Sequence, residues 1–126
     1  MLVDEDLTKA INAAAIEVHR TLGAGLLESA YQKCLARGLE LRGIGLEKEL
    51  DLPVDYKGAT VESGDRLDFV VEGRGIVEVK AVESISDIHH AQLLTYLKLS
   101  GNRVGLLLNF HSTRLVSRNG CQRLVL

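Results

Sequence analysis

The first third of the chain carries apolar residues at the three- and four-residue spacing of amphipathic helices. One helix is predicted from about Leu7 to Leu22, ending at Gly23-Ala24-Gly25, where glycine can adopt the left-handed exit conformation. A second helix is predicted from about Leu27 to Leu39, ending before Gly43. The apolar positions that define the pair are Leu7, Ile11, Ala14, Ala15, Val18 and Leu22, then Leu27, Tyr31, Cys34, Leu35 and Leu39.

The period then changes from that of a helix to that of strands. Apolar residues alternate with polar residues or proline over Leu50–Tyr56, which predicts a strand, and Pro53 favours a sheet edge. Lys57-Gly58 predicts a turn. Leu67–Val71 and Ile76–Lys80 predict two more strands, which are separated by a short glycine-containing loop.

The last third of the chain predicts a helix from about Asp87 to Leu99, which ends at Ser100-Gly101. The apolar run Val104–Phe110 is typical of a strand that is buried on both faces. Asn119-Gly120 predicts a hairpin turn between strands at 114–118 and 121–126. The order is therefore two helices, three strands, a helix, a strand and a hairpin, an α/β fold with a mixed sheet in one domain spanning residues 1–126.

Composition agrees with one soluble domain. The chain has 126 residues, of which 46% are hydrophobic and 25% charged, so it can bury a core without disulfides. It has no apolar run long enough to cross a membrane, and the acidic residues near its start are unlike a secretory signal. The two cysteines, Cys34 and Cys121, do not form a disulfide framework. We therefore expect a cytoplasmic protein without a membrane partner.

The charge is unevenly distributed although the net charge is only −2. All 17 Asp and Glu residues precede Ile88, whereas five of the 15 Lys and Arg residues follow it. The small net charge argues against a protein that coats nucleic acid through bulk charge. This uneven distribution is compatible with an acidic site beside a basic surface that binds a polyanion. It is equally compatible with acidic and basic residues that are interspersed on the surface once the chain folds.

The most informative polar residues are Asp68, Glu78 and Lys80, because all three interrupt apolar strands. Glu78 and Lys80 share one face, and taken alone they are typical of an ordinary surface ion pair. Asp68 shares that face only if the intervening loop has an odd number of residues or a bulge intervenes. We expect a three-residue loop such as Gly73-Arg74-Gly75, which would place Asp68 opposite Lys80.

Two carboxylates at one strand end make an oxygen-rich site that suits Mg²⁺ or Mn²⁺, which take one or two protein carboxylates and keep positions for water and phosphate oxygens. A lysine two residues away can orient an attacking water and offset developing charge. The four histidines lack the spacing of a zinc site, and His89 and His90 are interpreted as surface or boundary residues.

Two further motifs lie on predicted helices. Glu28 and Tyr31 share the first turn of the second helix, where the alternative is a dipole-stabilising glutamate and a core tyrosine. Gln92 and Tyr96 lie four residues apart on the later helix, where Gln92 is either a site residue or a boundary residue bonded to the backbone. No glycine-rich nucleotide loop and no GxSxG motif is present.

Together, Gly25-x-x-Glu28-x-x-Tyr31, Asp68, Glu78-x-Lys80 and the helix from Ala91 to Leu97 resemble the GxxExxY proteins, a branch of the PD-(D/E)xK nuclease-like superfamily. The resemblance implies a restriction-endonuclease-like αβββαβ core with an extra N-terminal helix and a C-terminal hairpin. It also implies Asp68, Glu78 and the Val79 carbonyl as metal ligands and Lys80 as catalytic, with Glu28 as an additional acidic residue that is expected to join both the metal site and the catalytic set. Gln92 and Tyr96 would line the site, and Tyr31 is expected beside the substrate.

The sequence thus predicts a nuclease that hydrolyses DNA or RNA with Mg²⁺ or Mn²⁺, with Arg103 and Arg114 as further substrate contacts. The alternative is a non-catalytic module on the same scaffold that binds nucleic acid or protein through basic residues, namely Arg103, Arg114, Arg118 and Arg123. The apolar C-terminal strand is a candidate for pairing between copies, so a homodimer is a third expectation.

Overall fold

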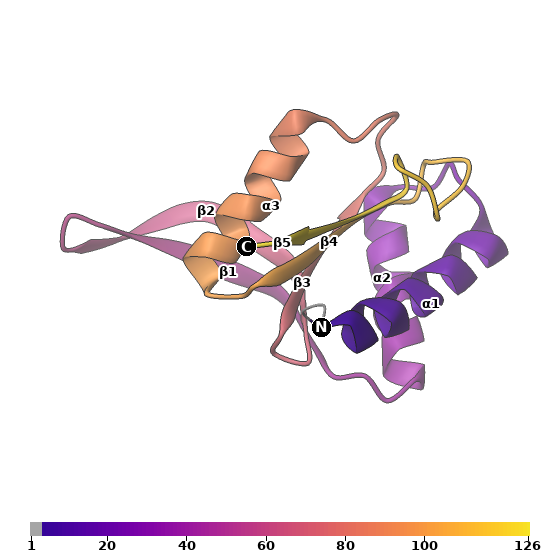
Figure 1. Ribbon diagram of the computed structural model, residues 1–126, viewed down its shortest axis with the longest axis horizontal. Helices are drawn as coiled ribbons and strands as arrows, with labels where there is room; N and C mark the ends of the chain where they lie inside the picture. Colours follow the sequence, from indigo (N-terminus) through magenta and orange to yellow (C-terminus); the bar gives the residue numbers. More distant parts are fainter. Residues whose placement is uncertain (1–3) are drawn as a thin grey trace.

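A computed structural model describes residues 4–126, and its elements follow the predicted order of helices and strands except for the strand predicted at 114–118 (Figure 1). In chain order they are α1 (Glu5–Leu22), α2 (Glu28–Leu41), β1 (Leu46–Tyr56), β2 (Ala59–Val71), β3 (Gly75–Lys80), α3 (Asp87–Ser100), β4 (Val104–Asn109) and β5 (Cys121–Val125). No helix in the described part of the chain has the length and hydropathy that are needed to cross a membrane.

The five strands form one sheet in the order β1-β2-β3-β4-β5. Strands β3 and β4 run parallel and are joined by α3, whereas the other neighbouring pairs are antiparallel. All six residues of β4 and five of the six in β3 are buried. A parallel pair covered on both faces explains why the 104–110 segment is a nearly continuous apolar run.

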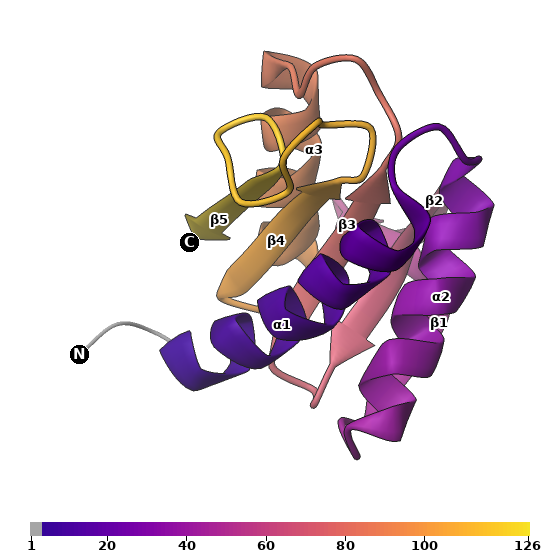
Figure 2. The ribbon, with the colours of Figure 1, turned by 90° about the vertical axis from the view of Figure 1, so that its right-hand side faces the viewer.

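Helices cover both faces of this central pair (Figure 2). Helices α1 and α2 pack on one face, where Ile11, Tyr31 and Phe110 belong to a buried cluster. Helix α3 packs on the other face with Leu93, and it approaches β4 so closely that a Cβ at Gly105 would lie 2.9 Å from a Leu93 methyl carbon. The mixed α/β architecture with helices on both faces confirms the predicted fold class.

The hairpin of β1 and β2 extends beyond the rest of the sheet (Figure 1). Its turn has positive φ at both Lys57 and Gly58, 47° and 82°, which is the geometry that matches the twist of a two-residue hairpin. Residues 59–66 are all exposed. β1 is an edge strand, as predicted from Pro53, whose missing N–H is tolerated there.

Three strand predictions are wrong by more than one residue, and the first is that β1 begins at Leu46 rather than Leu50. β2 begins at Ala59 rather than Leu67, because its outer half pairs with β1. That half has no buried face, so its sequence does not alternate between buried apolar and exposed polar residues. No strand forms at 114–118, and β5 pairs with β4 instead.

The absence of that hairpin has a local cause. Asn119 uses its side-chain amide to hold the loop before α3, with bonds to the Glu83 carbonyl at 2.9 Å and the Ile85 N–H at 2.8 Å. Gly120 packs under the loop, where a Cβ would lie 2.1 Å from the Leu115 carbonyl oxygen. The Asn-Gly pair is therefore used for a compact loop rather than a hairpin turn.

Candidate active site

Three carboxylates from three elements meet the backbone at the carboxyl end of β3. Asp68 on β2 accepts a hydrogen bond from the Val79 N–H at 2.8 Å, and Glu78 on β3 accepts one from the Asp68 N–H at 2.8 Å. Glu28 at the start of α2 accepts one from the Ala81 N–H at 3.2 Å. Each bond fixes one carboxylate oxygen, so the backbone of β2, of β3 and of the residue after β3 orients one acid each.

The register of β2 and β3 explains the first two contacts. Val71 pairs with Gly75 and Phe69 with Val77, so the loop between the strands is Glu72-Gly73-Arg74. The odd loop length that the sequence analysis required is therefore confirmed, but the loop lies one residue earlier than expected. Continuing this register places Asp68 opposite Glu78, and the expected pairing with Lys80 is wrong.

An irregularity in β1 and β2 sets the position of Asp68. Lys48 pairs with Phe69 and Leu50 with Leu67, but the intervening Glu49 has a left-handed φ of 53° and the ladder is interrupted there. Phe69 belongs to the cluster under α1 and α2, whereas Leu67 belongs to the cluster under α3. The side chains on the two sides of Asp68 in β2 therefore pack on opposite faces of the sheet. Asp68 itself lines a cavity beside α2.

Burial makes both central carboxylates hard to ionise. The side chain of Glu78 is 4% exposed, and burial followed by the nearby charge of Asp68 raises its pKa from 4.5 to about 8. Burial also raises the pKa of Asp68, although the Val79 N–H and the charge of Lys80 oppose that shift. The site therefore holds two acids whose ionisation is unfavourable unless a cation lies beside them.

Lys80 follows Glu78 on β3 and is half-buried. Its charge acts on both carboxylates, but within residues 4–126 it forms no ion pair shorter than 4.0 Å with either. The ordinary interpretation of Glu-x-Lys as a surface ion pair therefore does not describe this strand. A lysine without a close partner remains available to a bound group beside the carboxylates.

The donor set fits Mg²⁺ or Mn²⁺ better than a metal that needs an all-protein cage. Among residues 4–126, no group of three or more His, Cys, Asp or Glu side chains is arranged to hold a metal ion, so Glu28 does not complete a three-carboxylate cluster. Mg²⁺ needs only one or two carboxylates, because it retains several waters. Asp68 and Glu78 supply that number, and a divalent cation would offset the charge that burial makes costly.

Tyr31 holds the loop that presents Glu28. Its side chain is fully buried and stacks on Phe110, with ring centroids 4.7 Å apart. Its hydroxyl donates to the Gly23 carbonyl at 2.6 Å and accepts from the Leu26 N–H at 3.1 Å. The expectation that Tyr31 contacts substrate is therefore wrong, because the ring is covered and the hydroxyl is committed to the backbone.

Helix α3 brings the other predicted lining residues to the opposite side of the site. Tyr96 is 9% exposed and donates a hydrogen bond to Asp65 at 3.1 Å. Burial and this bond raise the pKa of Tyr96 to about 12, with smaller contributions from Glu78 and Asp68. Gln92 is half-buried one turn earlier on the same helix. Both remain predicted substrate residues.

The basic residues predicted to bind substrate do not share one surface. Arg103 precedes β4, which runs parallel to β3, so it lies at the end of the sheet away from the carboxylates. Arg114 and Arg118 lie in the loop after β4, at the carboxylate end. Arg123 on β5 donates to Thr8 of α1 at 3.2 Å. The structure therefore places the loop that carries Arg114, but not Arg103, at the end of the sheet where the carboxylates lie.

Three residues near the site were missed in the sequence. Glu49 stands beside Asp68 and carries no pattern that would have revealed it. His89 was interpreted as a surface or boundary residue, but the charges of Lys80 and Glu28 act on its ring. Asn109 is fully buried and holds the loop after β3 through both Val82 backbone groups, at 2.9 and 3.1 Å. Its signal was available, because it interrupts an otherwise apolar strand.

The chain matches the model of one known protein family. A family model described as the PD-(D/E)XK nuclease superfamily matches residues 5–124. No curated protein and no solved structure gave a significant match to the chain.

Proposed function

The chain belongs to the PD-(D/E)XK nuclease superfamily, and on that premise we propose that it is a metal-dependent nuclease that hydrolyses phosphodiester bonds in DNA or RNA. Asp68, Glu78 and the Val79 carbonyl would hold Mg²⁺ or Mn²⁺. The ion would supply positive charge that polarises a water molecule and the scissile phosphate.

The protein groups divide the remaining work. Lys80 would orient the attacking water and offset the charge that develops on the phosphate, a role that suits a compact ammonium group. Glu28 would add negative charge on the α2 side and hold the backbone after β3 in place. Gln92 and Tyr96 would contact substrate from α3, and Arg114 from the loop after β4.

The observation that carries this proposal is the burial of Glu78 against Asp68. A carboxylate that is 4% exposed beside a second acid is costly for folding, since neither can be solvated freely. A divalent cation removes that cost, and the neighbouring Lys80 supplies a group suited to phosphate chemistry. Membership of the GxxExxY branch, a cytoplasmic location and a homodimer stay predictions.

The test is cleavage of a panel of single- and double-stranded DNA and RNA with Mg²⁺, with Mn²⁺ and with EDTA. We expect cleavage that requires the metal and is lost in Lys80→Ala. Lys57→Ala at the hairpin turn removes the same charge away from the site and is expected to leave cleavage unchanged. Activity that persists in EDTA or in Lys80→Ala contradicts the proposal. Metal-independent binding without cleavage supports the alternative of a non-catalytic module.

A further inference from the structure

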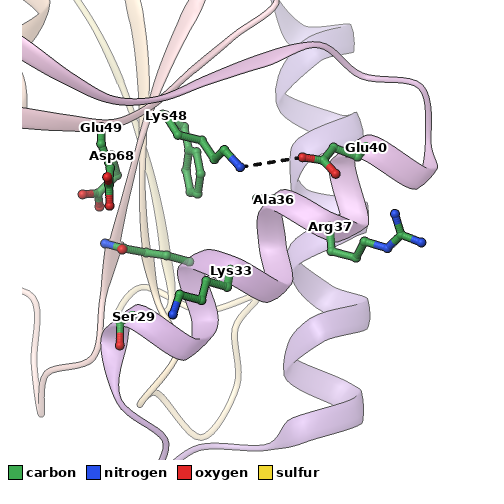
Figure 3. Close-up of a pocket in the computed structure, with 10 residues that line it drawn as sticks. Ser29, Lys33, Ala36, Arg37, Glu40, Lys48, Glu49 and Asp68 are labelled. Carbon is green, nitrogen blue, oxygen red and sulfur yellow. Dashed lines mark ion pairs between the residues drawn. The ribbon is translucent and has the colours of Figure 1, made fainter.

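A cavity of about 350 Å³ lies between α2 and the paired strands β1 and β2. Figure 3 shows Asp68 and Glu49 at one end of it and the ion pair of Lys48 with Glu40, 3.9 Å long, at the other. This size is typical of a site for one small ligand. The ten residues that line it are Ser29, Gln32, Lys33, Ala36, Arg37, Glu40, Lys48, Glu49, Asp68 and Phe69.

The cavity is continuous with the candidate active site through Asp68. Gln32 of α2 lines the cavity, and its side chain lowers the pKa of Asp68 against the larger effect of burial, which links the helix to the acid. Ala36 and Phe69 contribute buried apolar surface. A substrate strand whose scissile phosphate lies at Asp68 would therefore enter the cavity with its adjoining nucleotide.

Two cations on α2 give this cavity an anion-binding wall. Lys33 and Arg37 are four residues apart, so they project from the same helix face, about 6 Å apart along its axis. Both are exposed. Unlike Lys48, neither forms an ion pair within 4.0 Å in the described part of the chain.

We propose that this cavity is a subsite for one nucleotide of a single-stranded segment of the substrate, with Lys33 and Arg37 each bound to one of the two phosphates that flank it. The inference rests on the proposed nuclease function and gives the direction in which the strand leaves the cleaved bond. A single strand is the expected occupant, because a cavity of about 350 Å³ has room for one nucleotide and not for a duplex.

The experiment measures binding of a fluorescein-labelled single-stranded oligonucleotide by anisotropy in EDTA, over a series of salt concentrations. Each phosphate contact on a single strand contributes about 0.7 to the slope of log K against log salt, so K33A/R37A is expected to lower the slope by about 1.4. At low salt we expect at least tenfold weaker binding. K98A/R103A, which removes two cations from α3 and the far end of the sheet, is expected to keep the wild-type slope.

An unchanged slope in K33A/R37A, or no binding by the wild type, overturns the subsite. The single-strand assignment is overturned if the wild type binds a duplex more tightly than the single strand and K33A/R37A lowers the salt slope of duplex binding by the same amount. Because binding in EDTA requires no cleavage, the two proposals can fail separately. If the wild type binds with the expected slopes but does not cleave, the subsite stands and the nuclease proposal falls. If the wild type cleaves but the wild type and K33A/R37A have equal salt slopes, only the subsite proposal is overturned.

Discussion

Acidic side chains have opposite surroundings in the two halves of the sheet. The projecting part of the β1–β2 hairpin carries Asp55 and Glu62 in full contact with solvent, and Asp55 simply accepts a hydrogen bond from the Thr60 hydroxyl at 2.8 Å. On β3, Glu78 is 4% exposed and its pKa is raised to about 8 by burial and by Asp68. The hairpin acids keep an edge strand polar, whereas the cost of burying Glu78 requires another explanation, which the proposed metal site would supply.

The largest expected effect separates these two kinds of acid by activity. Glu78→Gln keeps the shape of the side chain but removes its charge, so we expect cleavage in Mg²⁺ to fall by at least about 100-fold. Glu62→Gln makes the same change in the hairpin and is expected to alter the rate less than twofold. Titration of Mn²⁺ by calorimetry checks the cause, because only Glu78→Gln should weaken metal binding. Equal rates in the two variants would remove the distinction between the regions.

Stability should follow the same division. Leu107 is fully buried between β4 and α3, and Leu107→Ala is expected to lower the free energy of unfolding by about 2–5 kcal/mol. Val61 is 49% exposed in the hairpin, and Val61→Ala is expected to change the free energy of unfolding by less than about 0.5 kcal/mol. Urea denaturation measures both. A hairpin variant as damaging as Leu107→Ala would show that the projecting strands belong to the cooperative core.

Sequence reasoning predicted best where burial imposes a pattern. The central strands, α1 and α2 were predicted because their apolar residues repeat with the period of a buried face. Helix α3 was predicted in its extent, but it buries Leu93, Tyr96 and Leu97 and leaves Ile88 and Leu94 exposed. The outer half of β2 has no buried face, so only pairing with β1 shows that it is a strand. The turn at Lys57-Gly58 was still predicted, because its backbone geometry depends on local residues alone.

The candidate site was predictable in its residues but not in its geometry. Asp68, Glu78 and Lys80 were conspicuous as charges in apolar strands. Their relation depended on where the three-residue loop falls and on the face exchange at Glu49, and neither leaves a mark in the order of residues. Tyr31 was assigned to substrate because a helix pattern cannot distinguish a buried ring with a satisfied hydroxyl from one that lines a cleft.

The pH dependence of stability sharpens the comparison without requiring activity. In the metal-free protein the pKa of Glu78 rises from 4.5 to about 8 on folding, so between these values the folded state binds more protons than the unfolded state. The contribution of Glu78 to stability is complete below about pH 4.5 and is lost as the pH rises through about 8. The slope approaches about 1.4 kcal/mol per pH unit for one proton.

Urea denaturation in EDTA from pH 5 to pH 8 measures this dependence. Glu78→Gln should flatten the profile and make the metal-free protein more stable than the wild type at pH 8, whereas Glu62→Gln should follow the wild type. Saturating Mg²⁺ should stabilise the wild type more at pH 8 than at pH 5, because the ion binds the deprotonated carboxylates. The assignment of a buried, proton-binding Glu78 would be contradicted by one result in EDTA. In that result the stability of the wild type rises with pH and the stability of Glu78→Gln does not.

The smallest expected effect concerns the α3 side of the site. The Nδ1 atom of His89 accepts the Ser86 N–H at 3.0 Å and completes the capping box of α3. In the neutral ring the proton is therefore on Nε2, and the pKa of His89 is lowered by burial and then by the charge of Lys80. A neutral donor beside Lys80 is suited to hydrogen-bond a phosphate oxygen of the substrate.

Two substitutions separate that role from capping, because both Gln and Glu are natural partners in a capping box. His89→Gln keeps an acceptor for Ser86 and an N–H donor, so we expect KM for the oligonucleotide within about twofold of the wild type. His89→Glu keeps the acceptor but has no donor, and KM is expected to rise several-fold. Ala91→Glu adds the same charge at an exposed position on the same helix and controls for repulsion alone. If His89→Glu raises KM no more than Ala91→Glu does, His89 only caps the helix, and the proposed contribution of α3 to the site is limited to Gln92 and Tyr96.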